Sequence, residues 1–404
     1  TWGKDRIWHK KLKLKPLGEP ELLQILDVLL DNTGWNQDSI KKQIADSTAG
    51  NPFFVEEMVQ CLKDQGTVLI EKLALPSTLA TVLDSRLSRL TARERRLLQQ
   101  ASVFGQTFWD TGLAALEGNA WDDEDWEKLR SKDLILRRDA GSIPGAREWI
   151  FRHALIQKAT EETVLLCDRK KWHIEAALWF ETQRIQDCAA QAAPHWEAGG
   201  NLEKASYAYR KAGNDSFTRY SNESAAYLFN KALAWQGWQP GERIEIALFL
   251  AKSLENLSQF DQMREAINSV EQLARNLGEE YFYNWAFQYL DTVRYFSDWS
   301  RADEVWNSVQ NNPITEAYYR VAIQYTYILI RQRRGKEAQT TFEEIEKARP
   351  FIDPLIEAEY LFRKALYHLN ITHNYTEAEQ LFLRACDTAE AQGELLIELK
   401  IAGN

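Results

Sequence analysis

The stretch Tyr209–Leu233, YRKAGNDSFTRYSNESAAYLFNKAL, contains the spacing that decides the fold. Within it, Ala225, Phe229 and Ala232 follow one order: a small residue, three residues, a large apolar residue, two residues, and a small residue. This spacing places the three side chains on one face of an α-helix. The small residues let a neighbouring helix approach closely, and the large side chain fills the space beside them.

The same order recurs along the C-terminal half of the chain, with Met, Val or Ile at some of the small positions. The copies begin at Ala205, Ala225, Met263, Ala302, Ala338 and Ala378. The first two copies start 20 residues apart, and the later ones 38, 39, 36 and 40 residues apart. These distances fit two-helix repeats slightly longer than the ~34-residue tetratricopeptide unit. One helix pair cannot bury its own apolar face, so we predict a solenoid of stacked pairs over residues 166–404, cut short at its C-terminal end.

One predicted repeat helix, residues 280–297, is rich in aromatic residues. Its expected core face consists of Phe282, Trp285, Tyr289, Val293 and Phe296. A second stripe beside this face contains Tyr283, Phe287 and Arg294. The second stripe either packs against the next repeat or lines the inner groove, where stacked repeats usually bind partners. Because aromatic and Arg side chains are the usual anchors of interfaces, these three residues are the candidate partner-binding residues.

Residues 71–165, before the repeats, combine helices with a predicted β-hairpin. Helices are expected after Pro76, after Phe108 and near 122–132, and Thr91–Glu94 is a capping box that starts another. The predicted hairpin strands are residues 134–139 and 148–153. Three or four helices closed by a hairpin are typical of a winged-helix domain.

Residues 1–70 predict one strand and three helices. Leu and Lys alternate over 8–17, which indicates a half-exposed strand, and helical patterns follow near 19–32 and 37–48. The third helix begins in Gly50–Gly66, GNPFFVEEMVQCLKDQG. Pro suits the first helical position and Asn can cap the free amides, so a well-started helix explains this stretch without any ligand. A lone strand with three helices makes a poor domain, so we expect the tail of a larger α/β unit.

Composition excludes several classes of protein. The chain has 404 residues, 49 Lys and Arg against 59 Asp and Glu, and a net charge of −10, which argues against a dedicated nucleic-acid binder. No apolar run approaches the ~18 residues of a membrane span. The four cysteines are scattered without metal-ligand spacing, which indicates thiols in a reducing compartment, so we expect a cytoplasmic protein without a metal site. Both ends of the sequence look cut.

The order of five motifs resembles one family. The motifs are GNPFFVEEMVQCLKDQG, LPSTLATVLDSRLSRL, ASVFGQTF, FRHALIQKAT and the repeat stretch quoted first. Together they resemble the signal-transduction ATPases with numerous domains (STAND ATPases), and most closely the branch of bacterial AAA-type modules linked to adenylate/guanylate cyclase, kinase or response-regulator domains. The resemblance covers most of the chain. It implies a mainly α protein: a lid remnant with the last strand of an AAA-like module (1–70), a winged-helix domain (71–165) and the repeats.

The resemblance also implies residue roles. In such ATPases a Gly-x-Pro element of the lid lies against the adenine, and Gly50, Asn51 and Pro52 match this element. Relatives with a Met-His-Asp motif use its His to sense the β-phosphate. His153 is the matching residue, although Ala154 replaces the acidic one. A helix-capping or core histidine remains the alternative for His153.

The sequence lacks a Gly-x4-Gly-Lys-Ser/Thr phosphate loop, so we expect no catalytic residues and no bound cofactor in this chain alone. ATP or ADP with magnesium would belong to the parent protein. We interpret the chain as a sensor portion that couples nucleotide state to a protein partner or small effector on the repeats, with self-association on activation. Two alternatives stay open: a repeat scaffold without any nucleotide role, and part of a transcription activator.

Overall fold

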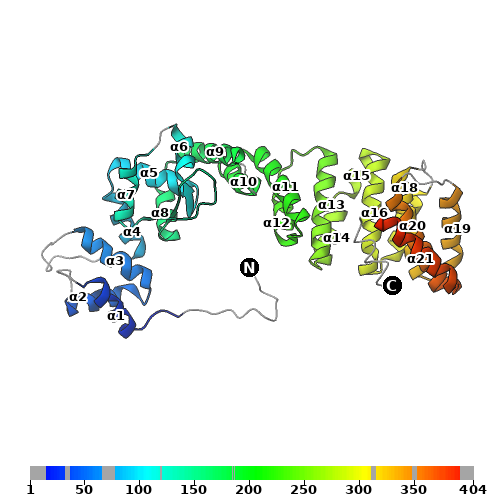
Figure 1. Cartoon of the computed structure of the whole chain (residues 1–404), viewed down its shortest axis with the longest axis horizontal. Helices are drawn as coiled ribbons and strands as arrows, with labels where there is room; N and C mark the ends of the chain where they lie inside the picture. The colour runs from blue at the N-terminus through cyan, green and yellow to red at the C-terminus, as the bar shows by residue number, and fades with distance from the viewer. Residues whose placement is uncertain are drawn as a thin grey trace. The chain divides into compact units, whose positions relative to one another are not determined.

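Helices make up nearly all regular structure of this chain, as predicted (Figure 1). The computed structural model describes residues 15–31, 37–65, 78–118, 121–183, 185, 187–310, 315–347 and 353–391. The chain divides into two compact units, residues 1–186 with 198–200 and residues 187–197 with 201–404. No helix among the described residues is long and apolar enough to cross a membrane.

The first helices of unit 1 share one apolar core. They are α1 (Glu19–Leu29), α2 (Asp38–Thr48), α3 (Pro52–Gln65) and α4 (Leu79–Ser88). Leu26, Ile44, Val55 and Met58 are fully buried within this core. The three predicted helices after residue 18 are therefore confirmed, whereas the strand predicted over 8–17 lies largely outside the described residues.

The remainder of unit 1 combines helices with a small sheet. Its elements are α5 (Ala92–Val103), β1 (Thr107–Trp109), α6 (Asp110–Glu117), α7 (Asp123–Ser131), β2 (Ile135–Arg137), β3 (Glu148–Phe151), α8 (Ala154–Glu162) and α9 (Leu166–Thr182). The predicted capping box is present, because Glu94 N donates to Thr91 Oγ1 at 3.3 Å and Thr91 N donates to Glu94 Oε2 at 2.9 Å. The predicted hairpin is confirmed as antiparallel β2 and β3. β1, which the sequence analysis missed, pairs with the other side of β3.

Helix α9 belongs to unit 1, although the sequence analysis counts its residues among the repeats. The ring centroids of Trp179 and Phe104 are 5.5 Å apart, and those of Phe180 and Trp109 are 5.6 Å apart. Four large rings in contact bury much apolar surface, and this surface ties α9 to α5 and β1.

The arginines on α5 are all engaged within unit 1. Arg93 Nη2 lies 2.6 Å from Asp125 Oδ2, and Arg96 pairs with Glu117 and with Asp168. Arg95 Nη2 donates to the carbonyl of Ser88 at 2.9 Å. These contacts give the arginines a structural role and do not favour DNA binding by this helix.

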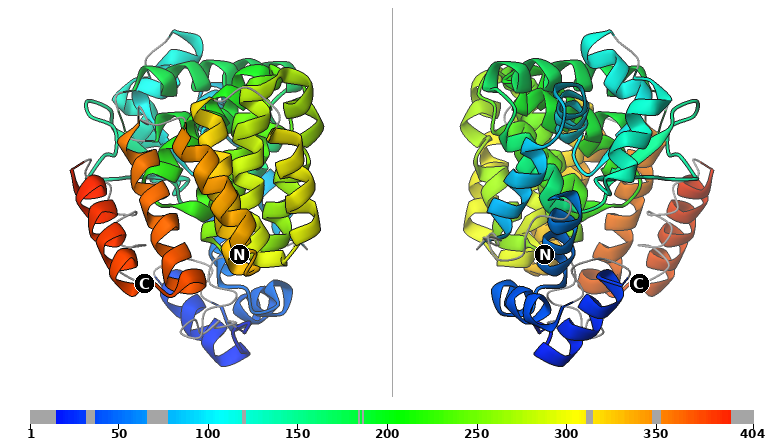
Figure 2. Two further views of the ribbon diagram at one scale, coloured as in Figure 1. Left: turned by 90° about the vertical axis from the view of Figure 1, so that its right-hand side faces the viewer. Right: turned by 90° about the vertical axis from the view of Figure 1, so that its left-hand side faces the viewer.

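Unit 2 is a stack of helices in which most successive members pack against one another (Figures 1 and 2). They are α10 (Cys188–Ala198), α11 (Leu202–Thr218), α12 (Asn222–Leu233), α13 (Pro240–Asn256), α14 (Phe260–Asn268), α15 (Glu271–Leu277), α16 (Glu279–Phe296), α17 (Trp299–Val309), α18 (Glu316–Arg331), α19 (Gly335–Lys347), α20 (Pro354–Tyr367), the π-helix η2 (His368–Thr372) and α21 (Tyr375–Glu390). Helix α16 packs against α18, and α18 packs against α20, so contacts also link alternate helices.

The repeat motif forms the core of this stack. Every motif residue is buried except Phe382, which is half-buried. At the contact between α11 and α12, a Cβ atom on Gly213 would lie only 2.7 Å from the ring of Phe229, so the two helices need glycine at this position to pack this closely. The solenoid prediction is confirmed at the level of its packing residues.

Unit 1 also contains a buried ion pair. Arg86 Nη1 on α4 donates to Glu57 Oε2 on α3 at 2.5 Å, and Arg86 Nη2 donates to the carbonyl of Lys132 at 2.5 Å. Both charged side chains are almost fully buried. Burial raises the pKa of the Glu57 carboxyl, and the Arg86 guanidinium opposes that rise. The pair fixes α3 against α4 and the end of α7.

The repeat core gives a matched stability test. We expect Phe342→Ala to cost ~3–5 kcal/mol of unfolding free energy, because its ring is buried. The same change at Phe382, which occupies the equivalent motif position but is half-buried, should cost clearly less. Thermal melting followed by circular dichroism compares the two variants. Equal losses would contradict the burial difference.

The ion pair gives a pH-dependent test. Arg86→Met leaves the Glu57 carboxylate buried and uncompensated, so we expect a loss of ~3–5 kcal/mol near neutral pH. A carboxyl group whose folded-state pKa lies above its unfolded value destabilises the fold least when it is protonated. The loss should therefore shrink as the pH falls through the folded-state pKa of Glu57.

Urea unfolding of both proteins at neutral and mildly acidic pH measures this loss. In a Glu57→Gln background, the effect of Arg86→Met should show no such pH dependence, which makes that pair of variants the control. A loss of the same size at every pH would show that Glu57 is not the group left unpaired.

Candidate functional site

The Gly-Asn-Pro element begins with a close contact between two backbone segments. Gly50 has a φ of +78°, and its carbonyl accepts a hydrogen bond from Leu17 N at 2.9 Å. A Cβ atom on Gly50 would lie 2.5 Å from the carbonyl oxygen of Leu17. The left-handed backbone and the close approach both require glycine here. The fold therefore accounts for Gly50 without a ligand.

The first amide groups of α3 are already satisfied. Asn51 Oδ1 accepts hydrogen bonds from Phe53 N at 3.1 Å and Phe54 N at 3.4 Å, and the carbonyl of Asn51 accepts one from Val55 N at 3.1 Å. Pro52 has no N–H group to offer. An anion therefore finds no free backbone donor at this helix start, which presents the exposed Pro52 ring and the half-buried Phe53 ring instead.

His153, at the N-cap position of α8, lies against this helix start. The centroids of the His153 and Phe53 rings are 4.1 Å apart. His153 Nε2 lies 3.5 Å from Glu56 Oε2, one turn further along α3. The structure thus brings together the two elements that the resemblance links to a nucleotide.

Neither structural alternative describes His153 completely. Its carbonyl accepts the first hydrogen bonds of α8, from Ile156 N and Gln157 N, but its side chain makes no capping bond. The side chain is 32% exposed, so it is not a core residue either. Nε2 makes no hydrogen bond with any residue that the structure describes. Nε2 is also buried from solvent, so a new partner can reach it only when Glu56 or another neighbouring group moves aside.

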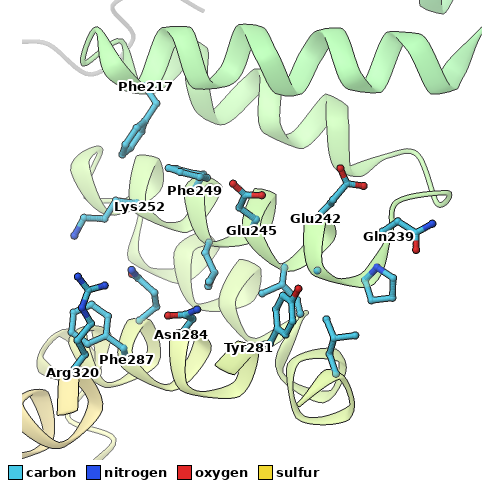
Figure 3. Close-up of a pocket in the computed structure, with 16 residues that line it drawn as sticks. Phe217, Gln239, Glu242, Glu245, Phe249, Lys252, Tyr281, Asn284, Phe287 and Arg320 are labelled. Atoms are coloured by element: carbon cyan, nitrogen blue, oxygen red, sulfur yellow. The ribbon is translucent and has the colours of Figure 1, made fainter. Parts of the chain in front are cut away.

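A second candidate site is a groove in unit 2, of about 820 Å³ (Figure 3). Helices α11, α13, α15, α16 and α18 contribute to its walls. Phe287 of the predicted second stripe lines this groove. Its volume falls within the range of small-molecule and cofactor sites.

The other two predicted partner-binding residues lie elsewhere. Tyr283 is 1% exposed and belongs to the core, so the prediction that a partner contacts it is wrong. Helix α16 packs against α14, α15 and α18, and the Tyr283 ring centroid lies 6.5 Å from that of Tyr318 on α18, so a neighbouring helix covers this part of the second stripe. Arg294 is not among the groove residues and donates to Glu255 Oε1 at 2.8 Å. Of the predicted core residues, Phe282, Trp285, Tyr289 and Val293 are buried, whereas Phe296 is only half-buried.

Helix α13 supplies much of the groove, and the sequence analysis missed it. Its half-buried Leu248 and Phe249 line the apolar part together with Phe217 of α11. At Gly241, a Cβ atom would lie 2.8 Å from the hydroxyl oxygen of Tyr281, so glycine leaves room for that ring. The sequence gives only a weak signal for this groove wall. A few apolar residues beside a core face can be recognised as part of a groove only when the positions of α13, α16 and α18 are known.

The described residues contain no group of three or more His, Cys, Asp or Glu side chains arranged to hold a metal ion.

The groove predicts a contrast within α16. We expect Tyr283→Ala to cost ~3–5 kcal/mol, as for other large buried aromatic side chains, because it opens a cavity in the core. Phe287→Ala removes part of a groove wall and should cost much less. Thermal melting of the two single variants measures the difference. If Phe287→Ala lowers the melting temperature as much as Tyr283→Ala, Phe287 serves packing and not a groove.

No family model and no curated protein matched the sequence. Among solved structures, the chain is similar to a STAND protein with a tetratricopeptide repeat sensor from Pyrococcus horikoshii, with 12% identity and a TM-score of 0.36 over 96% of this chain and 62% of that one. The apo form of RapI gives 9% identity and a TM-score of 0.39 over 95% of each chain. A Rap protein complexed with competence and sporulation factor gives 13% and 0.36 over 80% of this chain and 99% of that one. Sequence identities and TM-scores this low do not support assigning a function to this chain by similarity. The chain spans less than two thirds of the length of the Pyrococcus protein.

Proposed function

We propose that this chain is the regulatory portion of a STAND-type signal-transduction ATPase. In this proposal the groove of unit 2 binds an effector. The start of α3 and His153 face a nucleotide that the catalytic core of the parent protein holds. The carrying observation is the contact between Phe53 and His153, with ring centroids 4.1 Å apart. Two elements far apart in sequence, which the motif resemblance assigns separately to one nucleotide, meet in this contact.

The chemistry of the α3 start favours the base of the nucleotide over its phosphates. Pro52 and Phe53 offer apolar surface for an adenine ring, whereas Asn51 already occupies the amide donors. His153 is the polar group beside them, and Glu56 is its present neighbour. A phosphate oxygen on His153 would have to replace Glu56, so the two anions would compete for one imidazole.

A magnitude limits what His153 can do. One charge-assisted hydrogen bond contributes ~1.5–3 kcal/mol, whereas moving a two-state equilibrium from 1:99 to 99:1 needs ~5.5 kcal/mol. His153 alone cannot drive such a switch. Contacts around it must contribute, and the buried Glu57–Arg86 pair one residue beyond Glu56 is the nearest candidate.

The groove itself favours a second function. A partner-binding scaffold would need the groove of unit 2 and no nucleotide, and Phe287 at its wall suits such a role. The nucleotide response of His153 variants separates the two proposals.

In a protein that contains this chain together with its ATPase core, His153→Ala should weaken ADP binding roughly 10- to 150-fold, the equivalent of one lost charge-assisted bond. Glu56→Gln, which removes the competing carboxylate, should not weaken it. Equilibrium titration with a fluorescent ADP analogue measures both effects.

His368→Ala is the matched control, because His368 Nε2 makes a similar contact, 3.6 Å from Glu377 Oε1, within the repeats. Its ADP affinity should stay at the wild-type value. Unchanged affinity in His153→Ala, with an intact circular dichroism spectrum, would reject the nucleotide role and leave the scaffold.

A further inference from the structure

The groove of unit 2 has opposite charges at its two ends (Figure 3). Lys252 and Arg320 lie at one end, and Glu242 lies toward the other. We propose that the groove binds a short extended peptide, with its carboxylate end at Arg320 and Lys252 and its amine or basic end at Glu242 and Glu245. This inference rests on the proposed function, because it names the effector class of the same groove.

The cationic end has unused hydrogen-bond donors. Arg320 contributes to the groove from α18, and its side chain is 46% exposed. Its nearest carboxylate is Asp353 Oδ2, 3.7 Å from Nη2, and it makes no side-chain hydrogen bond with any described residue. A guanidinium has five N–H donors and binds a carboxylate through two parallel bonds. Lys252 adds a second cation, but its Nζ already donates to Glu255 at 2.6 Å and lies 3.9 Å from Asp291 Oδ2, so Arg320 is the main cation available to a ligand.

The acidic end has more negative than positive charge. Glu242 Oε1 and Glu245 Oε2 accept from the same guanidinium, that of Arg210, at 2.8 and 2.6 Å. Two carboxylates around one cation leave a net negative charge, and the Glu245 side chain is 51% exposed. A ligand amine or a basic side chain at this end would complete the pairing.

The distance between the ends sets the length of the peptide. Glu242 and Lys252 are ten positions apart on α13, which is ~15 Å along a helix at 1.5 Å per residue. An extended chain advances ~3.3 Å per residue, so about five residues span the two ends. A single amino acid is too short to reach both ends of the groove.

Side-chain amides on the wall suit an extended backbone. Asn284 and Gln288 of α16 both line the groove, one helical turn apart, and neither amide hydrogen-bonds to a described residue. Each amide has donors and an acceptor, which can pair with the N–H and C=O groups of an extended peptide. A helical ligand has already used most of these backbone groups internally. Phe217, Phe249 and Phe287 supply the apolar surface for the side chains of an extended peptide.

Pools of defined peptides test this proposal on the chain itself, without nucleotide. The first pool is Lys-Xaa-Xaa-Xaa-Asp with free termini, where Xaa is Leu, Val, Phe or Ser. The second is acetyl-Ser-Xaa-Xaa-Xaa-Asn-amide, which has the same length and no charge, and the third probe is the dipeptide Lys-Asp. Affinity selection with mass spectrometry should show the first pool bound at least about 10-fold more tightly than either control.

Arg320→Gln should lower the affinity for the first pool by about 10-fold or more. Arg331→Gln, which removes an exposed arginine of the same helix outside the groove, should leave it unchanged. Thermal melting checks that both variants are folded. If Arg320→Gln does not fold, Lys252→Met is a second test of the cationic end of the groove.

Three results would overturn the proposal. Equal binding of the uncharged pool would show a groove for apolar segments only, and equal binding of Lys-Asp would show a site for a small zwitterion. Failure of the folded wild-type chain to bind the first pool would exclude the peptide. None of these results bears on ADP affinity, so the peptide proposal and the nucleotide proposal fail separately.

Discussion

The solenoid depends on one type of contact: a large apolar side chain of one helix packed where a neighbour has almost no side chain. Phe229 against Gly213 and Ile371 against Gly335 are two examples, since an added Cβ atom would lie 2.7 Å from the Phe229 ring and 2.6 Å from the Ile371 side chain. At these two junctions the contact sets how near the packed segments approach each other. Helix α13 lies beside both α12 and α16, and side chains of α13 and α16 line the groove.

Much of the fold could be predicted because its signals are local. The burial of Phe342 and Trp306 follows from the motif spacing, and the capping box at Thr91 starts α5 where the sequence indicates. What could not be predicted depends on tertiary contacts. Strand β1 has only three residues and exists because β3 offers it a partner. Helix α9 joins unit 1 through ring contacts with residues more than 50 positions away.

The candidate sites divide in the same way. The sequence identifies Asn51 as a helix cap, and the structure contains those hydrogen bonds. It selects Phe287 for the groove but also Tyr283 of the same stripe, because a helical wheel cannot show where along the helix a stripe is covered by neighbouring helices. Which side of α16 stays open depends on where α15 and α18 lie. Arg320 escapes a sequence search altogether, since a single arginine on an exposed face has no distinctive pattern.

The walls of the groove come from helices of several consecutive repeats, and this arrangement has a mechanical consequence. In a solenoid each repeat is stabilised mainly by its immediate neighbours, so the stack can open locally at a weak junction while the rest remains folded. A molecule bound in the groove contacts α13, α16 and α18 at the same time. It therefore adds contacts that link these helices to one another. Occupancy of the groove thus opposes bending and local opening of the stack. A more rigid solenoid can transmit a displacement at one repeat to the repeats further along the stack, whereas a more flexible solenoid would bend locally.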